Sequence, residues 1–278
     1  MKKQNFGGKW TTDKLNILSS YLAFYLTALK KQSFNKIYID AFAGTGKIAV
    51  GDEQEEIEGS VRLALNSAGK FDEYIFIEKK KAFARELQRI VDNEYSELRD
   101  KVTIINDDCN VALTEICKNT DWKSNRAILF LDPYATEVKW DTLKIVSSTK
   151  AFDVWYLFPF SAAVRMMKND GKIDDSWKVK LNMLFGDDGW FDRFYMLNPQ
   201  MTLFDEENND NLIKVVNTLE LSNYITERLQ SIFSAVAKSP KLLYNTRNTP
   251  LFLFCFAVAN DNPRAYTLAM RCADHILR

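Results

Sequence analysis

The sequence has a single histidine among its 278 residues, His275, three positions from the C-terminus. This scarcity excludes a Ser/His/Asp triad and a catalytic metal held by histidines. The four cysteines form no CxxC pair, which argues against a disulfide framework and against a four-ligand zinc site. We therefore expect reduced thiols, no metal, and chemistry that works without imidazole.

Long apolar runs are also missing. The longest, residues 251–259, has nine residues, whereas a membrane span needs about 20. The N-terminus leads into polar sequence without a hydrophobic signal region. With 46% hydrophobic and 27% charged residues, the composition is that of an ordinary globular chain. We expect a soluble cytoplasmic protein that does not contact a membrane.

An excess of charge of either sign is absent, because 37 basic residues balance 37 acidic ones. This balance argues against a broad polybasic coat for nucleic acid. The charges are unevenly spread, however: residues 1–36 carry an excess of six positive charges, residues 238–278 an excess of four, and residues 52–58 hold five acids. These runs indicate either solvated surfaces or a basic surface shared by the two ends of the chain.

The hydrophobic pattern predicts an α/β protein. Residues 11–31 show helical spacing, with Thr11 and Thr12 as N-cap candidates. Five short apolar runs then alternate with segments of helical periodicity, which predicts a parallel sheet covered on both faces. The predicted strands are residues 36–43, 74–78, 102–106, 127–133 and 153–159, and the predicted helices are residues 60–68, 81–97, 111–118 and 142–148.

After Pro159 the alternation stops. Residues 160–240 look helical and contain no convincing strand, and a sixth strand at 250–259 precedes a helix from about Pro263. The predicted fold is a Rossmann-like, doubly wound, mostly parallel sheet with a helical insertion before the last strand. We divide the chain into an N-terminal basic amphipathic helix (1–35) packed on the core, a cofactor-binding domain (36–159 and 245–278) and a mainly helical insertion (160–244).

The first strand ends in a glycine-containing turn, Asp40 to Lys47. A Walker A loop is excluded, because Ala41 stands at its first glycine and Ile48 follows the lysine. A dinucleotide fingerprint would need a third glycine where Ala49 stands, although alanine is sometimes accepted there. The third nucleotide-site interpretation is the acidic residue and Gly-x-Gly turn of Rossmann-like methyltransferases, and an ordinary strand-to-helix turn is the alternative.

Acidic side chains also follow the next two strands. Glu78 ends the second strand and is placed to accept hydrogen bonds from ribose hydroxyls, and Asp107 or Asp108 could accept one from an adenine amino group. Each acid alone could equally be a helix N-cap or a solvated turn. Ligands bind beyond the carboxyl ends of parallel strands, so the three strand ends together predict a nucleoside-bearing cofactor.

The fourth strand ends in Asp132, Pro133 and Tyr134. In enzymes that methylate amino groups, an Asp or Asn and a proline-fixed carbonyl at this position accept hydrogen bonds from the amine, while an aromatic ring stacks on the base. A flipped or single-stranded base fits such a slot. A proline turn with a half-buried tyrosine is the alternative.

These motifs occur in an order that resembles a known family. The segments WTTDKLNILSSYL, YIDAFAGTGKI, GSVRLAL, FIEKK, NDDCN, FLDPYATEVKW, DVWYLFP and ADHIL are similar to the three-Cys-motif partner proteins, from about Trp10 to Leu277. The resemblance implies a class I S-adenosylmethionine-dependent methyltransferase fold and a partner protein that carries the three cysteines, so Cys109 and Cys117 are not those cysteines.

Carried over to this sequence, the resemblance implies S-adenosylmethionine as cofactor and a reaction centre at Asp132, Pro133 and Tyr134. The cofactor-binding residues that we expect are Asp40, Phe42, Gly44, Gly46, Glu78, Asp107 and Asp108. The sequence departs from adenine methyltransferases in having one proline before the aromatic residue where they usually have two. It also inserts an acidic segment, residues 47–58, between the glycine turn and the next helix.

Three further residues are weaker candidates for contacts with substrate. Trp140 follows the fourth strand, and Arg165 and Arg247 are placed to contact phosphates, although such arginines are usually solvated. The sequence thus predicts a methyltransferase that acts on an amine, most plausibly an adenine base of nucleic acid. The alternative is a non-catalytic methyltransferase-like scaffold for a three-Cys-motif protein. A nicotinamide-dependent oxidoreductase is disfavoured by the missing third glycine.

Overall fold

The computed structural model describes residues 9–45, 47–50, 55–198 and 212–278. Its centre is an eight-stranded sheet in the order β10-β12-β7-β6-β1-β4-β5, with β11 also paired to β12. The first five strands of the sheet along the chain are parallel to one another, and β12 runs antiparallel to β7. The strands of this sheet are β1 (Asn35–Asp40), β4 (Glu73–Ile77), β5 (Val102–Ile105), β6 (Asn125–Leu131), β7 (Phe152–Phe158), β10 (Ala235–Val236), β11 (Lys241–Tyr244) and β12 (Pro250–Val258).

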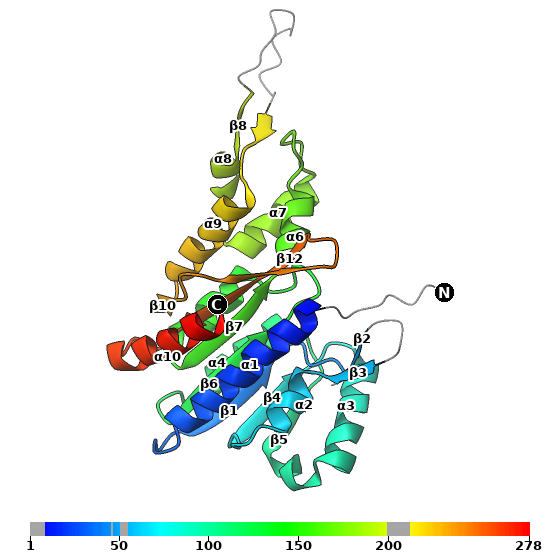
Figure 1. Ribbon diagram of the computed structural model, residues 1–278, viewed down its shortest axis with the longest axis vertical. Helices are drawn as coiled ribbons and strands as arrows, with labels where there is room; N and C mark the ends of the chain where they lie inside the picture. The colour runs from blue at the N-terminus through cyan, green and yellow to red at the C-terminus, as the bar shows by residue number, and fades with distance from the viewer. Residues whose placement is uncertain (1–8, 46, 51–54, 199–211) are drawn as a thin grey trace, which may run out of the picture.

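Helices cover both faces of this sheet, because alternate residues of its buried strands point to two separate cores. One core joins Tyr38, Phe130 and Trp155 to α1, α2, α3 and α10, and the other joins Ile39, Leu129 and Tyr156 to α4, α5, α6, α7 and α9. Figure 1 shows α1 and α10 lying across the first of these faces. The helices are α1 (Lys9–Ala28), α2 (Ser60–Leu65), α3 (Lys81–Glu94), α4 (Cys109–Asn119), α5 (Trp140–Ser148), α6 (Phe160–Met166), α7 (Asp175–Phe185), α8 (Trp190–Phe194), α9 (Thr218–Gln230) and α10 (Pro263–Ile276), with the 3-10 helix η1 (Ser96–Lys101).

This architecture confirms the predicted Rossmann-like α/β fold. Strands buried on both faces are continuously apolar, which is the pattern that the sequence shows. α1 packs against α10, so the first and last helices of the described chain lie side by side. None of the helices in the described part of the chain has the length and apolar character of a membrane span. The four cysteines are free.

Several local predictions are wrong. Thr11 and Thr12 are not N-caps, because α1 already begins at Lys9. The segment 160–240 does contain strands, which were overlooked because they have only two or three residues: β8 (Tyr195–Leu197), β9 (Leu212–Lys214) and β10. The acidic segment 47–58 is not a simple loop, because β2 (Lys47–Val50) and β3 (Glu55–Glu58) pair as an antiparallel hairpin. Residues 51–54 between them lie outside the described residues.

Two strands extend the sheet on the far side of β12. β10 and β11 both precede residue 245 and both pair with β12, so the central sheet includes part of the segment that the sequence assigned to the insertion. Their short length leaves no periodic signal to detect. The division of the chain into domains stays a prediction.

Candidate functional site

The sheet reverses its winding direction between β1 and β6. Chain order runs outward from β1 to β4 and β5, then returns to β6 on the other side of β1 and continues to β7. In doubly wound folds the ligand site lies beyond the carboxyl ends of the strands at this switch point. Asp40 is the last residue of β1 and Asp132 directly follows β6, so these two carboxylates flank the switch point.

Asp40 is fully buried beneath the site. Its carboxylate accepts hydrogen bonds from the Phe42 backbone N–H at 3.1 Å and from Ser60 Oγ, at the start of α2, at 2.5 Å. Burial raises the pKa of Asp40 to about 6, against the lowering effect of these two donors. Asp132 raises this pKa further and Lys14 lowers it, which places all three groups in one electrostatic cluster.

The turn after β1 is tied to the end of β4. Gly44 has a φ of +60°, in the left-handed region that favours glycine, and its N–H donates to Glu78 Oε2 at 3.0 Å. The other oxygen of Glu78 accepts the Lys80 N–H at 2.7 Å, and Glu78 is 7% exposed. A Cβ on Gly44 would meet no atom within 4 Å, so open space lies in front of this turn. Gly46, predicted to bind the cofactor, lies outside the described residues.

The two aspartates after β5 have different surroundings. Asp108 is the N-cap of α4: its Oδ1 accepts the N–H of Asn110 at 3.0 Å, and its Oδ2 pairs with Lys79 at 3.0 Å. Asp107 is exposed, and one of its oxygens accepts the N–H of Asp108. Of the two predicted positions, Asp107 therefore has the carboxylate that is freer to contact a ligand.

The segment after β6 carries the predicted reaction centre. Pro133 is buried, and the Tyr134 ring is 68% exposed with the Lys80 ammonium 5.7 Å from its centroid. Asn110, on the first turn of α4, holds the next part of the loop. Its amide donates to the Glu137 carbonyl at 2.8 Å and accepts the Lys139 N–H at 2.9 Å. The first turn of α4 thus fixes the path of the chain that follows Tyr134.

Lys14, from the N-terminal helix α1, is a residue of the site that sequence reasoning missed. Its ammonium pairs with Asp132 Oδ2, and the lysine is only 4% exposed. The same ammonium lies 4.9 Å from the centroid of the Trp10 ring, which packs on Phe252 of β12. No described residue donates to the other oxygen of Asp132. α1 therefore supplies the cation that compensates a carboxylate at the switch point, and leaves one acceptor oxygen available.

The remaining predicted residues each have different surroundings. Phe42 is half-buried against the core and contributes its backbone N–H to Asp40. Trp140, expected to contact substrate, is 3% exposed and fills the space beside Gly186 and below the Arg228 guanidinium. Arg165 on α6 and Arg247 in the turn between β11 and β12 are exposed. Their roles stay predictions, and for Trp140 the burial indicates a role in packing.

The raised pKa of Asp40 makes a prediction about stability. Above the folded pKa of Asp40, about 6, the buried ionised carboxylate lowers the free energy of unfolding. This penalty disappears below the ordinary pKa near 4, because the carboxyl group is then protonated in both the folded and the unfolded protein. A shift of this size corresponds to an upper value of about 3 kcal/mol. In urea denaturation, we expect the free energy of unfolding of Asp40→Asn to exceed that of the parent by about 2 kcal/mol at pH 8 and to equal it at pH 4.

Asp141→Asn is the matched control for this measurement. The Asp141 side chain is 84% exposed, so its replacement should leave the stability unchanged at both pH values. A gain for Asp40→Asn that is equal at pH 4 and pH 8 would contradict the assignment of a buried, costly charge to Asp40.

Comparison with known proteins gives similarities in fold only. No protein-family model matches the sequence, and no curated protein matches it. Similar solved structures include protein LPL1258 of Legionella pneumophila, assigned to the DUF519 family model, with 12% identity, 96% of this chain and 92% of that chain covered, and a TM-score of 0.47. Magnesium protoporphyrin IX methyltransferase from Synechocystis with bound SAH is 14% identical, with 93% and 90% covered and a TM-score of 0.41. Spermidine synthase from Thermotoga maritima is 10% identical, with 92% and 61% covered and a TM-score of 0.42.

Proposed function

We propose that this protein is an S-adenosylmethionine-dependent methyltransferase that acts on an amine, the amino group of an adenine base in nucleic acid. The observation that carries the proposal is the hydrogen bond from the Gly44 N–H to Glu78. It joins a left-handed turn after β1 to a buried carboxylate after β4, and β1 lies beside β6, which the Asp132-Pro133-Tyr134 segment follows. The class I methyltransferase resemblance of the sequence supports the same assignment.

The residues at this edge fit such a cofactor. A carboxylate oxygen has two lone pairs, so each oxygen of Glu78 can accept a ribose hydroxyl in addition to its present donor. Asp107 is exposed to accept the adenine amino group, and the open space before Gly44 allows the backbone to approach a ligand closely. When bound, the cofactor would supply a methyl group on a positively charged sulfonium, a charge that suits an edge lined by carboxylates.

The protein itself would act by positioning. The free oxygen of Asp132 accepts one N–H of the substrate amine, which turns the nitrogen lone pair away from the carboxylate. Lys14 compensates the charge of this carboxylate and fixes its orientation, and the exposed ring of Tyr134 offers a face on which a base can stack. A positioned amine needs little general-base catalysis, so a reaction that uses no histidine is compatible with this site.

A second candidate function is a non-catalytic, cofactor-binding scaffold for a three-Cys-motif protein. The observation in its favour is the Lys14–Asp132 pair, since an internal ammonium already occupies part of the acceptor proposed for a substrate amine. In this alternative the site binds the cofactor without transferring the methyl group, and the partner protein recognises the loaded form.

Binding of the cofactor tests what both candidates share. Gly44→Arg places a long side chain in the open space before the turn and forces a non-glycine residue to a φ of +60°. We expect calorimetry with S-adenosylhomocysteine to show binding by the parent and an at least tenfold weaker affinity in the variant. Gly189→Arg is the control, because Gly189 is exposed, has a negative φ and would place its Cβ no nearer than 3.8 Å to another residue. Equal affinities of Gly44→Arg and parent would rule out the cofactor site.

Methyl transfer distinguishes the two candidate functions, the methyltransferase and the non-catalytic scaffold. The protein is incubated with radiolabelled S-adenosylmethionine and total RNA or DNA, alone and together with a purified three-Cys-motif protein. Label in nucleic acid supports the methyltransferase. Cofactor binding without label under either condition supports the scaffold.

A further inference from the structure

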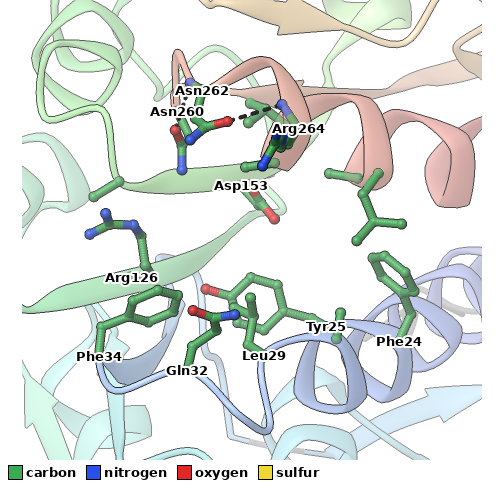
Figure 2. Close-up of a pocket in the computed structure, with 16 residues that line it drawn as sticks. Phe24, Tyr25, Leu29, Gln32, Phe34, Arg126, Asp153, Asn260, Asn262 and Arg264 are labelled. Atoms are coloured by element: carbon green, nitrogen blue, oxygen red, sulfur yellow. Dashed lines mark hydrogen bonds between the residues drawn. The ribbon is translucent and has the colours of Figure 1, made fainter.

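A cavity lies at the opposite edge of the sheet from Asp40 and Asp132, where β6 and β7 begin. It has a volume of about 390 Å³ and lies between the C-terminal half of α1 and the N-terminal half of α10. Figure 2 shows side chains from the two helices facing each other across it. The apolar side chains that line it include Phe24, Ala28, Leu29, Ala265, Leu268 and Ala269. Its place at the amino ends of parallel strands separates it from Asp40 and Asp132 at the carboxyl ends.

A carboxylate forms part of the cavity lining. Asp153, near the start of β7, is directed into the cavity toward Tyr25 (Figure 2). Its Oδ2 accepts the Tyr21 hydroxyl at 2.6 Å, and its Oδ1 accepts no hydrogen bond from any described residue. Burial raises the pKa of Asp153 to about 6 against the opposing effects of Tyr21 and Arg126, so the group is mainly ionised at neutral pH. A desolvated carboxylate with an unused oxygen in a cleft is typical of a ligand site.

The rim of the cavity is basic and rich in amides. Arg126 donates through Nη1 to the carbonyls of Trp122 and Asn125, both at 2.7 Å, and its guanidinium lies 4.9 Å from the centroid of the Phe34 ring. These contacts hold the group at the rim with its Nη2 free of described partners. Arg264 is exposed on the first turn of α10 and lines the cavity, while its backbone N–H donates to the N-cap Asn262 at 3.0 Å. Asn260 completes this side of the rim.

These features select the ligand by its charge. An anion at the floor would be repelled by Asp153, and a cation at the rim would be repelled by Arg126 and Arg264. The apolar walls suit a flat ring, and the unused oxygen of Asp153 calls for an N–H donor on that ring. Guanine presents two adjacent N–H donors on one edge, whereas the same edge of adenine carries an acceptor beside its amino group.

We propose that this cavity binds a guanine mononucleotide, with the base between α1 and α10, its N–H edge on Asp153 and its phosphate at Arg126 and Arg264. The volume lies within the range of small-molecule sites, roughly 300 to 1,000 Å³. This site is independent of the methyltransferase assignment, because it shares no residue with the edge at which Gly44, Glu78 and Asp132 lie.

Calorimetry with GMP on the full chain at pH 7.5 tests the proposal. We expect one molecule to bind per chain, and AMP to bind at least tenfold more weakly. Asp153→Asn keeps an acceptor for the Tyr21 hydroxyl but turns an N–H₂ group toward the base. It should therefore lower the affinity for GMP at least tenfold. Arg264→Met should lower the affinity for GMP about fivefold and should hardly change the affinity for guanosine, which has no phosphate. Arg271→Met is the control, since Arg271 is exposed two turns further along α10 and does not line the cavity.

The outcomes distinguish this cavity from the proposed cofactor site. GMP affinity that is kept in Gly44→Arg and lost in Asp153→Asn supports the proposal, even if S-adenosylhomocysteine does not bind at all. Loss of GMP binding in Gly44→Arg, or no binding of GMP at millimolar concentration, overturns it. Because Arg264 is exposed, the Arg264→Met variant should fold even if Asp153→Asn does not, and an unchanged GMP affinity in Arg264→Met also overturns it.

Discussion

Alanine at position 132 should lower the rate of methyl transfer by about 10²- to 10³-fold, which is the usual effect of removing one positioning hydrogen-bond group from a reaction centre. Asp132 follows β6 at the switch point and has one oxygen on Lys14 and the other unused, so its removal deletes the acceptor that would orient the amine. The measurement is incorporation of label from S-adenosylmethionine into nucleic acid at saturating cofactor. Affinity for S-adenosylhomocysteine should fall far less, because Gly44 and Glu78 remain.

Two controls make the Asp132 result specific. Asp132→Asn retains a carbonyl acceptor and should lose less activity than Asp132→Ala. Asp141→Ala removes a carboxylate that is 84% exposed on the first turn of α5, and should leave the rate unchanged. Equal transfer by Asp132→Ala and parent would show that the reaction centre lies elsewhere.

The fold could be predicted because its main signals are local. Buried parallel strands are apolar on both faces, and the runs ending near Asp40, Glu78 and Asp132 stand out for that reason. Because parallel strands end at one edge of a sheet, the order of strands and acids along the chain is enough to assign these acids to a common site. The structure places Asp40, Glu78 and Asp132 at that edge.

What the sequence could not predict depends on contacts between distant segments. The Lys14–Asp132 pair spans 118 positions, and a lysine in an amphipathic helix is normally taken for a solvated residue. Asp107 and Asp108 are adjacent and alike in sequence, and only the start of α4 at Cys109 makes Asp108 the N-cap. Trp140 resembles a stacking residue in sequence, whereas the close approach of Gly186 on another segment makes it a core residue.

The cavity at the other edge illustrates the same limit. Asp153 belongs to the predicted strand 153–159, in which the sequence indicates no site residue, and it becomes notable only because α1 and α10 close over it. No motif connects these helices, because each covers the sheet through its own apolar stripe. A site formed by two chain ends has no local sequence signature.

Lys14 should be the largest single contributor to stability among the charged residues of the switch point. Methionine at this position keeps most of the side-chain volume but leaves the Asp132 carboxylate without its cation, and removing one partner of a buried pair typically costs about 3–5 kcal/mol. Because the Asp132 side chain is 22% exposed, we expect Lys14→Met to lower the free energy of unfolding by about 3 kcal/mol in urea denaturation at pH 7.5.

The double variant separates the ion pair from simple packing. In Lys14→Met/Asp132→Asn no unpaired charge remains, so most of the lost stability should return, and the coupling of the two substitutions should exceed about 1 kcal/mol. Lys9→Met, at an exposed lysine of the same helix, should change stability by less than about 0.5 kcal/mol. If Lys14→Met is as stable as the parent, or if the double variant is no more stable than Lys14→Met, the ammonium does not compensate Asp132. In that case α1 is anchored by its apolar face alone, and the switch point would need another cation to hold its carboxylates.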